Sequence, residues 1–476
     1  MQLNKENYKM PFIELFKTIY GYYFYDVNKN TILEIGKEEY DLLYQCLKKN
    51  EFKLNDQLSE LIDNGYLKDE RAEFIEHFGI YNIENLLNRK IKKITLQLTQ
   101  DCNFRCKYCL YTKGKNAHQR GHSKQKMSWE IAKKSIDYVI KHSIDNKIIN
   151  IGFYGGEPLI EFELIKKCIE YTQRECIGKI FTYTITTNGT LITDKIVEFF
   201  LKYNVICVLS LDGPKHINDK NRVFHNGNGT YDVVVQKILN IKEKYPQFSS
   251  KLQLNMVVDP QNSFDELCNI DFDRLGLDEN RVNISFVDWA DESDNVKISD
   301  EFISGYNYGL FLSYLYYMGI IDKDGISPIK LILAKELIDE IEKGHATNRI
   351  GKYAAPSGPC IPGQARLFIT CKGEMYPCER VSETSEIMKI GNLEVGINCE
   401  KAIYLLQVGK VGENVCKNCW AFRKCKMCAK LADDGDKMSA EKKFSHCSEI
   451  KERARLQIEV EIMMDEARKR KLSVRR

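Results

Sequence analysis

The middle of the chain alternates between short apolar segments and amphipathic stretches of helical period. Residues 94–98 place an apolar side chain at every second position, which is typical of a strand. A helical stripe of apolar residues follows at 132–140. Strands that alternate with helices predict a parallel α/β architecture, here a partial (β/α)6 barrel of the TIM type, whose strand carboxyl ends carry the site. The five further strands are expected at 149–154, 181–187, 205–211, 252–258 and 282–287.

The first 80 residues show a different pattern, in which a hairpin precedes two short helices. A helix-ending Asn-Gly pair closes the second helix. Hairpin plus helices indicates a winged-helix-like module whose exposed edge could accept an extended peptide, and the alternative is a simple N-terminal cap. The strands are expected at 22–26 and 31–34 around turn residues 28–30, and the helices at 40–47 and 58–62, ending at Asn64 and Gly65.

Composition narrows the possible partners. The chain has 476 residues, which suggests two or three domains, and a formal net charge of +3, which indicates neither nucleic acid nor an anionic membrane as a partner. No apolar run reaches transmembrane length, and the aromatic stretch 306–317 is expected to be a core helix. The polar first residues and the 17 cysteines, an odd number, favour a reducing cytoplasm over a disulfide framework.

Three cysteines, Cys102, Cys106 and Cys109, follow the first strand of the α/β region. Three thiolates in one tight loop can hold three irons of a cubane cluster and leave the fourth iron without a protein ligand. Zinc sites usually use paired C-x2-C knuckles, which the x3 gap fits poorly. The spacing therefore favours an iron–sulfur cluster with one open iron.

With Tyr108 before the last cysteine, this C-x3-C-x2-C motif resembles the radical S-adenosylmethionine (SAM) superfamily. In that family the open iron binds the amino and carboxylate groups of SAM. Reduction cleaves SAM to methionine and a 5′-deoxyadenosyl radical, which abstracts a hydrogen from the substrate. The resemblance implies a [4Fe–4S] cluster on these cysteines, SAM as cofactor, and an electron donor such as flavodoxin or ferredoxin.

Loops at the ends of the next strands supply candidate SAM contacts. Two adjacent glycines after the second strand let backbone approach a ligand closely, and the resembling family binds the SAM amino group with this GGEP loop. Arg222 is a candidate bidentate partner for the SAM carboxylate, with a surface salt bridge as the alternative. The residues expected to contact SAM are Tyr108, Gly155, Gly156, Glu157, Thr187, Asn188, Ser210, Asp212 and Arg222.

The C-terminal third carries a second group of cysteines, which resembles the SPASM extension of radical SAM peptide-modifying enzymes. That extension holds two auxiliary [4Fe–4S] clusters, which gives three clusters in all. The spacing between the last two central cysteines is x2 here, where the family has x3. Taken alone, the two C-x2-C pairs also fit zinc knuckles. The resemblance implies a distal cluster on Cys416, Cys419, Cys425 and Cys447 and a proximal cluster on Cys360, Cys378 and Cys428.

The sequence leaves two alternatives for each of two residues near the proximal cysteines. Cys371 is expected on the first arm of a hairpin that turns at Lys372 and Gly373. It either supplies an eighth ligand or points away, which would leave an open iron for a substrate thiolate. Glu379 follows Cys378 directly. Sulfatase-maturing relatives carry an Asp there that acts as a base, so Glu379 is a candidate catalytic base, with a solvated hairpin carboxylate as the alternative.

These features combine into one functional expectation. A ribosomally made, Cys-containing precursor peptide binds through its leader and receives thioether crosslinks between a Cys sulfur and a carbon. The alternatives are a carbon–carbon crosslink or epimerisation, formylglycine-forming sulfatase maturation, and a zinc scaffold without catalysis. The expected domains are 1–80 for leader recognition, 90–300 for the barrel, 301–345 for a helical connector, 346–450 for the SPASM region and 451–476 for a C-terminal helix with a basic tail.

Overall fold

A ten-stranded, mostly parallel sheet forms the main body of the computed structural model. Each of the six strands expected from the sequence is present, and they pair in chain order, all parallel, as in Leu96 beside Phe153. They are β5 (Lys93–Thr99), β6 (Ile148–Gly155), β7 (Ile180–Thr187), β8 (Ile206–Ser210), β9 (Gln253–Val258) and β10 (Val282–Phe286). The structure describes residues 9–52, 56–111, 121–175, 178–287, 298–344, 346–356 and 358–474.

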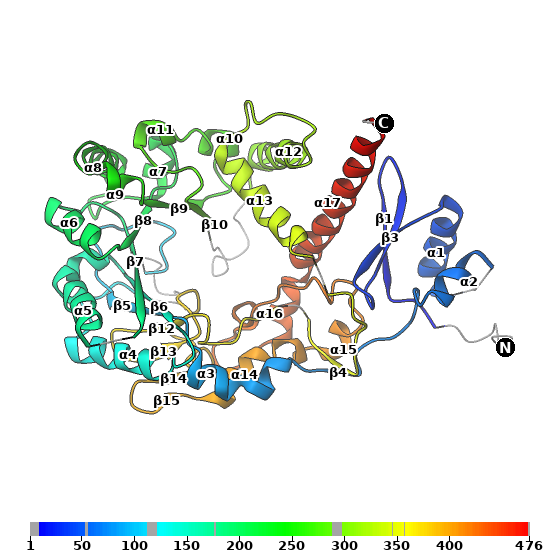
Figure 1. Ribbon diagram of the computed structural model, residues 1–476, viewed down its shortest axis with the longest axis horizontal. Coiled ribbons are helices and arrows are strands. Elements are labelled where there is room, and N and C mark those ends of the chain that lie inside the picture. The colour runs from blue at the N-terminus through cyan, green and yellow to red at the C-terminus, as the bar shows by residue number, and fades with distance from the viewer. Residues whose placement is uncertain are drawn as a thin grey trace.

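Helices cover the outer side of this curved sheet (Figure 1). At least one helix follows each of the strands β5 to β9, as expected for βα units. The apolar stripe of α4 includes Ile136 and Val139, which are fully buried in the same core as Leu96. The helices of this region are α4 (Trp129–Lys141), α5 (Phe162–Glu175), α6 (Asp194–Lys202), α7 (Lys215–Asn221), α8 (Tyr231–Lys244), α9 (Pro246–Ser249), α10 (Phe264–Leu267) and α11 (Phe272–Leu275).

The two faces of the parallel sheet differ in polarity. Successive side chains of a strand point to opposite faces. On β5, Ile94, Leu96 and Leu98 face the helices, so Thr95, Gln97 and Thr99 share the inner face. On β7 the half-buried residues of the inner face are again all threonines, Thr182, Thr184 and Thr186. The concave side of the sheet is therefore a polar surface.

A C-terminal hairpin continues the sheet beyond β5. Strand β12 (Leu367–Ile369) pairs parallel with β5 and antiparallel with β13 (Glu374–Tyr376). The hairpin turns at Lys372 and Gly373, as the sequence indicates, and Gly373 has φ +82°. Two more short strands, β14 (Gly391–Asn392) and β15 (Gly396–Ile397), complete the edge. This pairing places the cysteine-rich C-terminal region against the first strand of the parallel sheet.

The N-terminal module has the expected hairpin and two helices, and one strand more. Its antiparallel sheet contains β1 (Ile13–Lys17), β2 (Tyr22–Asp26) and β3 (Thr31–Ile35), followed by α1 (Lys37–Lys49) and α2 (Asp56–Asp63). The added strand β1 leaves β1 and β3 as the two edges of the sheet.

The N-terminal sheet lies beside the long C-terminal helix α17 (Cys447–Val474) (Figure 1). Phe12, Phe16 and Tyr25 pack with Ile458 of that helix in one buried cluster. The phenol of Tyr23 donates to Glu466 Oε1 at 2.8 Å. The first and last segments of the chain thus form a single packed unit.

The remaining elements connect these parts. The aromatic stretch is helix α12, as expected, and it packs with α13 and α17 through Tyr314, Leu337 and Val460. No helix in the described part of the chain is long and apolar enough to cross a membrane. The other elements are β4 (Phe74–Ile75), α3 (Ile83–Arg89), α12 (Asp300–Tyr317), α13 (Pro328–Glu342), β11 (Tyr353–Ala354), α14 (Cys399–Leu406), α15 (Glu413–Cys416) and α16 (Ala440–Ser445).

Candidate active site and cysteine groups

The loop after β5 brings Cys102, Cys106 and Cys109 into one group at the carboxyl end of the sheet. Each of the first two thiols lies close enough to the other cysteines to interact with them electrostatically. The backbone N–H of Phe104 donates to Cys102 Sγ at 3.4 Å. Such N–H donors to sulfur are one means by which proteins adjust an iron–sulfur cluster.

Burial raises the pKa of the Cys102 thiol to about 12 and that of Cys106 to about 11. A low-dielectric surrounding disfavours a bare thiolate. A metal cation reverses this preference, because a coordinating thiol is deprotonated outright. The thiols of Cys102 and Cys106 therefore suit a positively charged metal cluster better than a free nucleophile.

The double-glycine loop after β6 lies directly against the cysteine loop. Gly155 has φ +139°, and a Cβ there would lie 2.2 Å from the carbonyl oxygen of Thr99. A Cβ on Gly156 would lie 2.1 Å from the carbonyl oxygen of Asp101. Only glycine allows this approach. The backbone N–H of Gly156 donates to the Thr99 carbonyl at 2.8 Å, which joins the two loops.

Glu157 is buried and bound within the protein. Its carboxylate accepts hydrogen bonds from the Thr187 hydroxyl at 2.7 Å, the Asn188 N–H at 2.8 Å and the Leu159 N–H at 3.0 Å. Burial raises the pKa of Glu157, and these donors oppose the rise. Glu157 and Thr187, both expected to contact SAM, therefore contact each other and join the ends of β6 and β7.

Asn188 reaches the cysteine loop from the end of β7. Its side-chain amide donates to Asn103 Oδ1 at 2.8 Å. The Asn103 amide in turn donates to the hydroxyl of Thr190 at 2.9 Å. Ser210, at the end of β8, is buried and lies beside Asn255 of β9 in the sheet. The carboxyl ends of these parallel strands thus lie together around the cysteine loop.

Three of the residues expected to bind SAM form a buried polar cluster. Arg222 Nη1 donates to the phenol oxygen of Tyr108 at 2.8 Å, and that phenol donates to Asp212 Oδ2. The second Asp212 oxygen accepts from the N–H of Val257 at 3.0 Å. Within the described chain, the buried Nε of Arg222 has no hydrogen-bond partner. This orphaned donor, close enough to Cys106 to influence its pKa, is suited to a ligand carboxylate.

Cys360, Cys378 and Cys428 come together from three separate segments. Both Cys360 and Cys428 influence the pKa of Cys378, which burial raises to about 11. Cys371 has different neighbours. Its backbone N–H donates to Gln97 Oε1 at 3.1 Å, and its Sγ lies 3.8 Å from Gln125 Oε1. Burial, and after it the charge of Glu383, raises the pKa of its thiol to about 11.

The other four cysteines line a separate cavity of about 170 Å³. They are Cys416, Cys419, Cys425 and Cys447, the four that were expected to act together. In the parts of the chain that the structure describes, no three His, Cys, Asp or Glu side chains converge closely enough to hold a single metal ion. A larger cluster, whose separate irons each take one thiolate, suits groups with this wider spacing.

Glu379 lies at the opposite end of β5 from the first cysteine loop. Its Oε1 is 2.8 Å from Nη1 of Arg366, the residue before β12, and it interacts electrostatically with Lys93, the first residue of β5. A strand of 7 residues spans about 20 Å. Glu379 and Cys378 are thus separated from Cys106 by approximately the length of the polar inner face.

Functional side chains on that inner face were not singled out from the sequence. Gln97 Nε2 donates to the Tyr111 phenol at 2.9 Å and to Glu383 Oε1 at 2.6 Å. The signal was present, because polar residues at 95, 97 and 99 interrupt an otherwise apolar strand. The pairing of β12 with β5 brings Glu383 and Cys371 beside Gln97, and this pairing was not predicted from the sequence.

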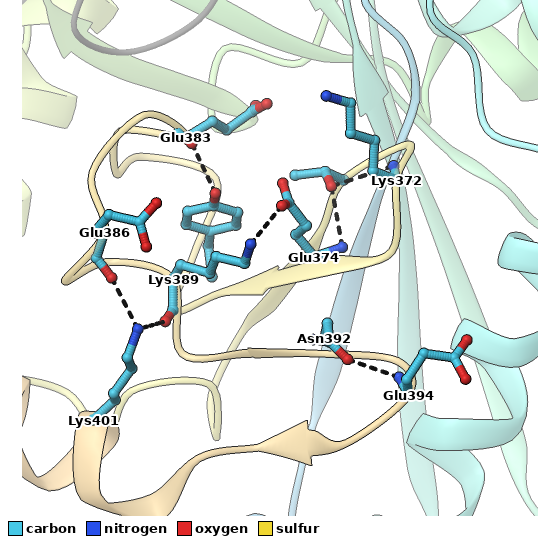
Figure 2. A network of polar contacts seen from close by, with 10 residues as sticks. Lys372, Glu374, Glu383, Glu386, Lys389, Asn392, Glu394 and Lys401 are labelled. Carbon is cyan, nitrogen blue, oxygen red and sulfur yellow. Dashed lines mark hydrogen bonds and ion pairs between the residues drawn. The ribbon is translucent and has the colours of Figure 1, made fainter.

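One ion pair and two hydrogen bonds to backbone carbonyls hold the segment that carries Glu383 in place. Lys389 Nζ lies 2.6 Å from Glu374 Oε1, and Lys401 donates to the carbonyls of Glu386 and Lys389 (Figure 2). The Glu383 side chain points away from this network, while its carbonyl accepts from the Tyr376 phenol at 2.7 Å (Figure 2). The loop is thereby anchored with its carboxylate directed toward Gln97.

Comparisons with known proteins agree with this arrangement. Residues 96–271 match the family profile of the radical SAM superfamily. The chain is 28% identical over 430 residues to the radical SAM cyclopropyl synthase TigE of Paramaledivibacter caminithermalis, covering 83% of each chain. It is 23% identical over 370 residues to a cysteine-type anaerobic sulfatase-maturating enzyme of Clostridium perfringens, covering 74% of this chain and 92% of that one.

A solved structure shares the fold. Native anSMEcpe with bound AdoMet superposes with a TM-score of 0.56 at 18% sequence identity, covering 78% of this chain and 99% of that one. The same protein with bound AdoMet and Cp18Cys peptide gives a TM-score of 0.55 at 17% identity. At this level of identity the likeness concerns the fold.

Proposed function

Because this chain contains a radical SAM domain and is an enzyme, we propose that it closes thioether bonds within a ribosomally made, Cys-containing precursor peptide. The observation that carries the proposal is the polar inner face of the parallel sheet. This face runs from the SAM-type loop at Cys102 to the three cysteines around Cys378. A peptide lying along it could reach both ends.

The cysteine loop and the strand ends around it would hold the SAM cluster and SAM. When bound, a [4Fe–4S] cluster with SAM supplies a 5′-deoxyadenosyl radical that takes a hydrogen atom from the substrate. The Nε–H of Arg222 would donate to the SAM carboxylate. Gly155 and Gly156 would place the loop expected to bind the SAM amino group directly against the cysteine loop. An external donor such as flavodoxin or ferredoxin would supply the electron.

The inner face offers hydrogen-bonding groups to a peptide backbone. Half-buried Thr186 on β7 and Asn255 on β9 place a hydroxyl and an amide on the concave side. The hydroxyls of Thr182 and Thr184 lie on the same face and share hydrogen bonds with Asn150. Extended peptides are commonly bound through main-chain hydrogen bonds with a few side-chain pockets. Burial of this surface under the substrate would also exclude water from the reacting carbon.

The composition of the proximal group supports thioether formation. Cys360, Cys378 and Cys428 are three thiols, and Cys371 has Gln97 and Gln125 as neighbours. A cluster held by three cysteines keeps one iron available to bind and deprotonate a substrate thiol. We infer that Cys371 is not a ligand and that a substrate cysteine uses this position.

The N-terminal module would bind the leader of the precursor. Its sheet ends in two edges, β1 and β3, and β3 is half-exposed along its length. An exposed edge can accept an extended segment as an additional strand. The contacts of Tyr23 and Phe16 with α17 fix the module relative to the rest of the protein, which would give the leader a defined distance from the site.

A carbon–carbon ring is the second candidate product. A relative matched over 83% of this chain is named a radical SAM cyclopropyl synthase. Both products begin with removal of a hydrogen atom from a peptide carbon and differ in the atom that bonds to it. Sulfatase maturation is a further alternative, because a relative matched over 74% of this chain is named for it.

Anaerobic co-expression with candidate precursor peptides, followed by mass spectrometry, separates these reactions. Thioether formation predicts loss of two hydrogens per link together with loss of thiol alkylation. Loss of two hydrogens with every thiol still alkylated would identify a carbon–carbon ring. An aldehyde that reacts with hydrazine would identify formylglycine. Absence of 5′-deoxyadenosine in all trials with iron-loaded enzyme would contradict the proposed function as a whole.

A further inference from the structure

The cavity formed by the four distal cysteines has an unusual distribution of charge. Its lining contains two lysines, Lys443 and Lys451, and no aspartate or glutamate. The other lining residues are apolar apart from Gln407. An apolar cavity that faces two cations and no carboxylate is suited to an anionic occupant.

The ammonium nitrogen of Lys443 is surrounded in this cavity by hydrogen-bond acceptors. It is 2% exposed, and its Nζ donates to the carbonyl of Val408 at 2.9 Å and also to that of Val411. The same Nζ lies 3.1 Å from Cys416 Sγ. Carbonyl oxygens accept hydrogen bonds and cannot donate them, so each of these contacts uses an N–H of Lys443.

Among the residues that the structure describes, Lys443 forms no ion pair with a carboxylate, and the thiol of Cys416 lies 3.1 Å from its Nζ. A buried charge without a compensating partner is unfavourable. A [4Fe–4S] cluster with four thiolate ligands carries roughly two net negative charges. Lys443 and the lining Lys451 would balance such a cluster, which explains why lysine is tolerated at this position.

A fixed cation beside a ligand sulfur also affects electron affinity. Reduction adds one negative charge to the cluster, and a neighbouring cation stabilises the reduced state more than the oxidised state. Hydrogen bonds to cluster sulfurs and the net charge of the surroundings are known determinants of the reduction potential. The Lys443 ammonium supplies both effects to the sulfur of Cys416.

We propose that Lys443 is a positioning residue that raises the reduction potential of the cluster held by Cys416, Cys419, Cys425 and Cys447. This inference rests on the proposed function, which assigns a cluster to those four cysteines. Its consequence is that the distal cluster is set to accept an electron released during peptide oxidation, rather than to donate one to SAM.

The experiment compares Lys443→Met with Lys442→Met in the full-length enzyme. Lys442 is the adjacent residue of α16, is exposed and pairs with Asp434, so its replacement makes the same change in net charge away from the cavity. A Cys416→Ala variant identifies the distal component. Iron content is measured first, and the clusters are then titrated with a reductant and monitored by electron paramagnetic resonance.

Lys443→Met should increase the oxidised-to-reduced ratio of the distal component at least tenfold at a fixed potential, about 59 mV for a one-electron couple. Lys442→Met should keep this ratio within about twofold of the parent enzyme's value, because solvent and salt screen an exposed charge. An unchanged ratio in iron-replete Lys443→Met would overturn the inference. If Lys443→Met fails to retain iron, Lys443→Gln, which keeps an N–H donor without the charge, must shift the ratio in the same direction. If Cys416→Ala retains all of its iron, the assignment of a cluster to the four distal cysteines is wrong.

Discussion

Arg222 donates a hydrogen bond from Nη1 to the phenol oxygen of Tyr108 at 2.8 Å. This contact joins the segment after β8 to the loop that carries Cys106 and Cys109. It occupies Nη1 of the guanidinium, and no hydrogen-bond acceptor among the described residues reaches the buried Nε–H. A buried donor of this kind is costly unless a ligand accepts its hydrogen bond.

Replacing Arg222 by Gln should weaken SAM binding by about 10- to 100-fold, because a charge-assisted hydrogen bond is lost. Anaerobic equilibrium dialysis with iron-replete protein measures this change. Tyr108→Phe is the matched control, since it removes a partner of Arg222 and keeps the cation. Equal SAM affinity in Arg222→Gln and the parent enzyme would remove Arg222 from the SAM site.

Gly156→Ala should displace the cysteine loop, because the added Cβ would meet the Asp101 carbonyl at 2.1 Å. We expect loss of about a third of the bound iron, the share of one cluster in three, with loss of SAM cleavage. Gly121→Ala is the control, since nothing lies within 4 Å of a Cβ at Gly121. Full iron content in Gly156→Ala would show that the loop adapts without cost.

Replacing Cys102, Cys106 and Cys109 together by Ala should abolish SAM cleavage and leave the iron of about two clusters in place. The reason is that the two other cysteine groups lie on separate segments. Iron analysis and assay of 5′-deoxyadenosine test both parts. Complete loss of iron would indicate that the auxiliary sites depend on the first cluster, contrary to the separate groups observed.

Cys371→Ala should leave the iron content unchanged, whereas Cys378→Ala should lower it. Cys371 contacts Gln97 and Gln125, while Cys378 lies with Cys360 and Cys428. Iron quantification on anaerobically purified protein distinguishes the two variants. Equal loss of iron in both would make Cys371 the fourth ligand of the proximal cluster and weaken the case for a substrate thiolate there.

Glu379→Gln should lower crosslinked product by at least about a hundredfold if this carboxylate removes a substrate proton. SAM cleavage should continue, because Glu379 lies at the far end of β5 from Cys106. Arg366→Gln is a useful comparison, since it removes the ion-pair partner at 2.8 Å and leaves the carboxylate. Undiminished product in Glu379→Gln would exclude it from the reaction.

Local patterns were sufficient for much of the fold. The alternation at 94–98 and the five later apolar runs all became strands, because each segment carries its own period and its own flanking helix. The turn at Lys372 and Gly373 was equally local, since glycine is favoured at φ +82°. Strand β1 was missed, and its pairing with β2 depends on packing against α17.

The residues of the site also differ in whether local sequence or tertiary packing determines their contacts. Cys102, Cys106 and Cys109 lie within one loop, so their grouping followed from spacing alone. The contact of Glu157 with Thr187 could not be foreseen, because a side chain that can bind a ligand can equally bind its own protein, and only the packed structure decides between them.

The sequence by itself determined the residue types, their spacing in the first cysteine loop and the order of strands and helices, since these depend on neighbours along the chain. Tertiary structure alone decided that β12 pairs with β5, that Cys371 lies beside Gln97, and that Lys443 lies against Cys416. The physical reason is that such contacts join segments far apart in the chain. Their partners are selected by burial and by the need to satisfy buried polar groups, which no local pattern encodes.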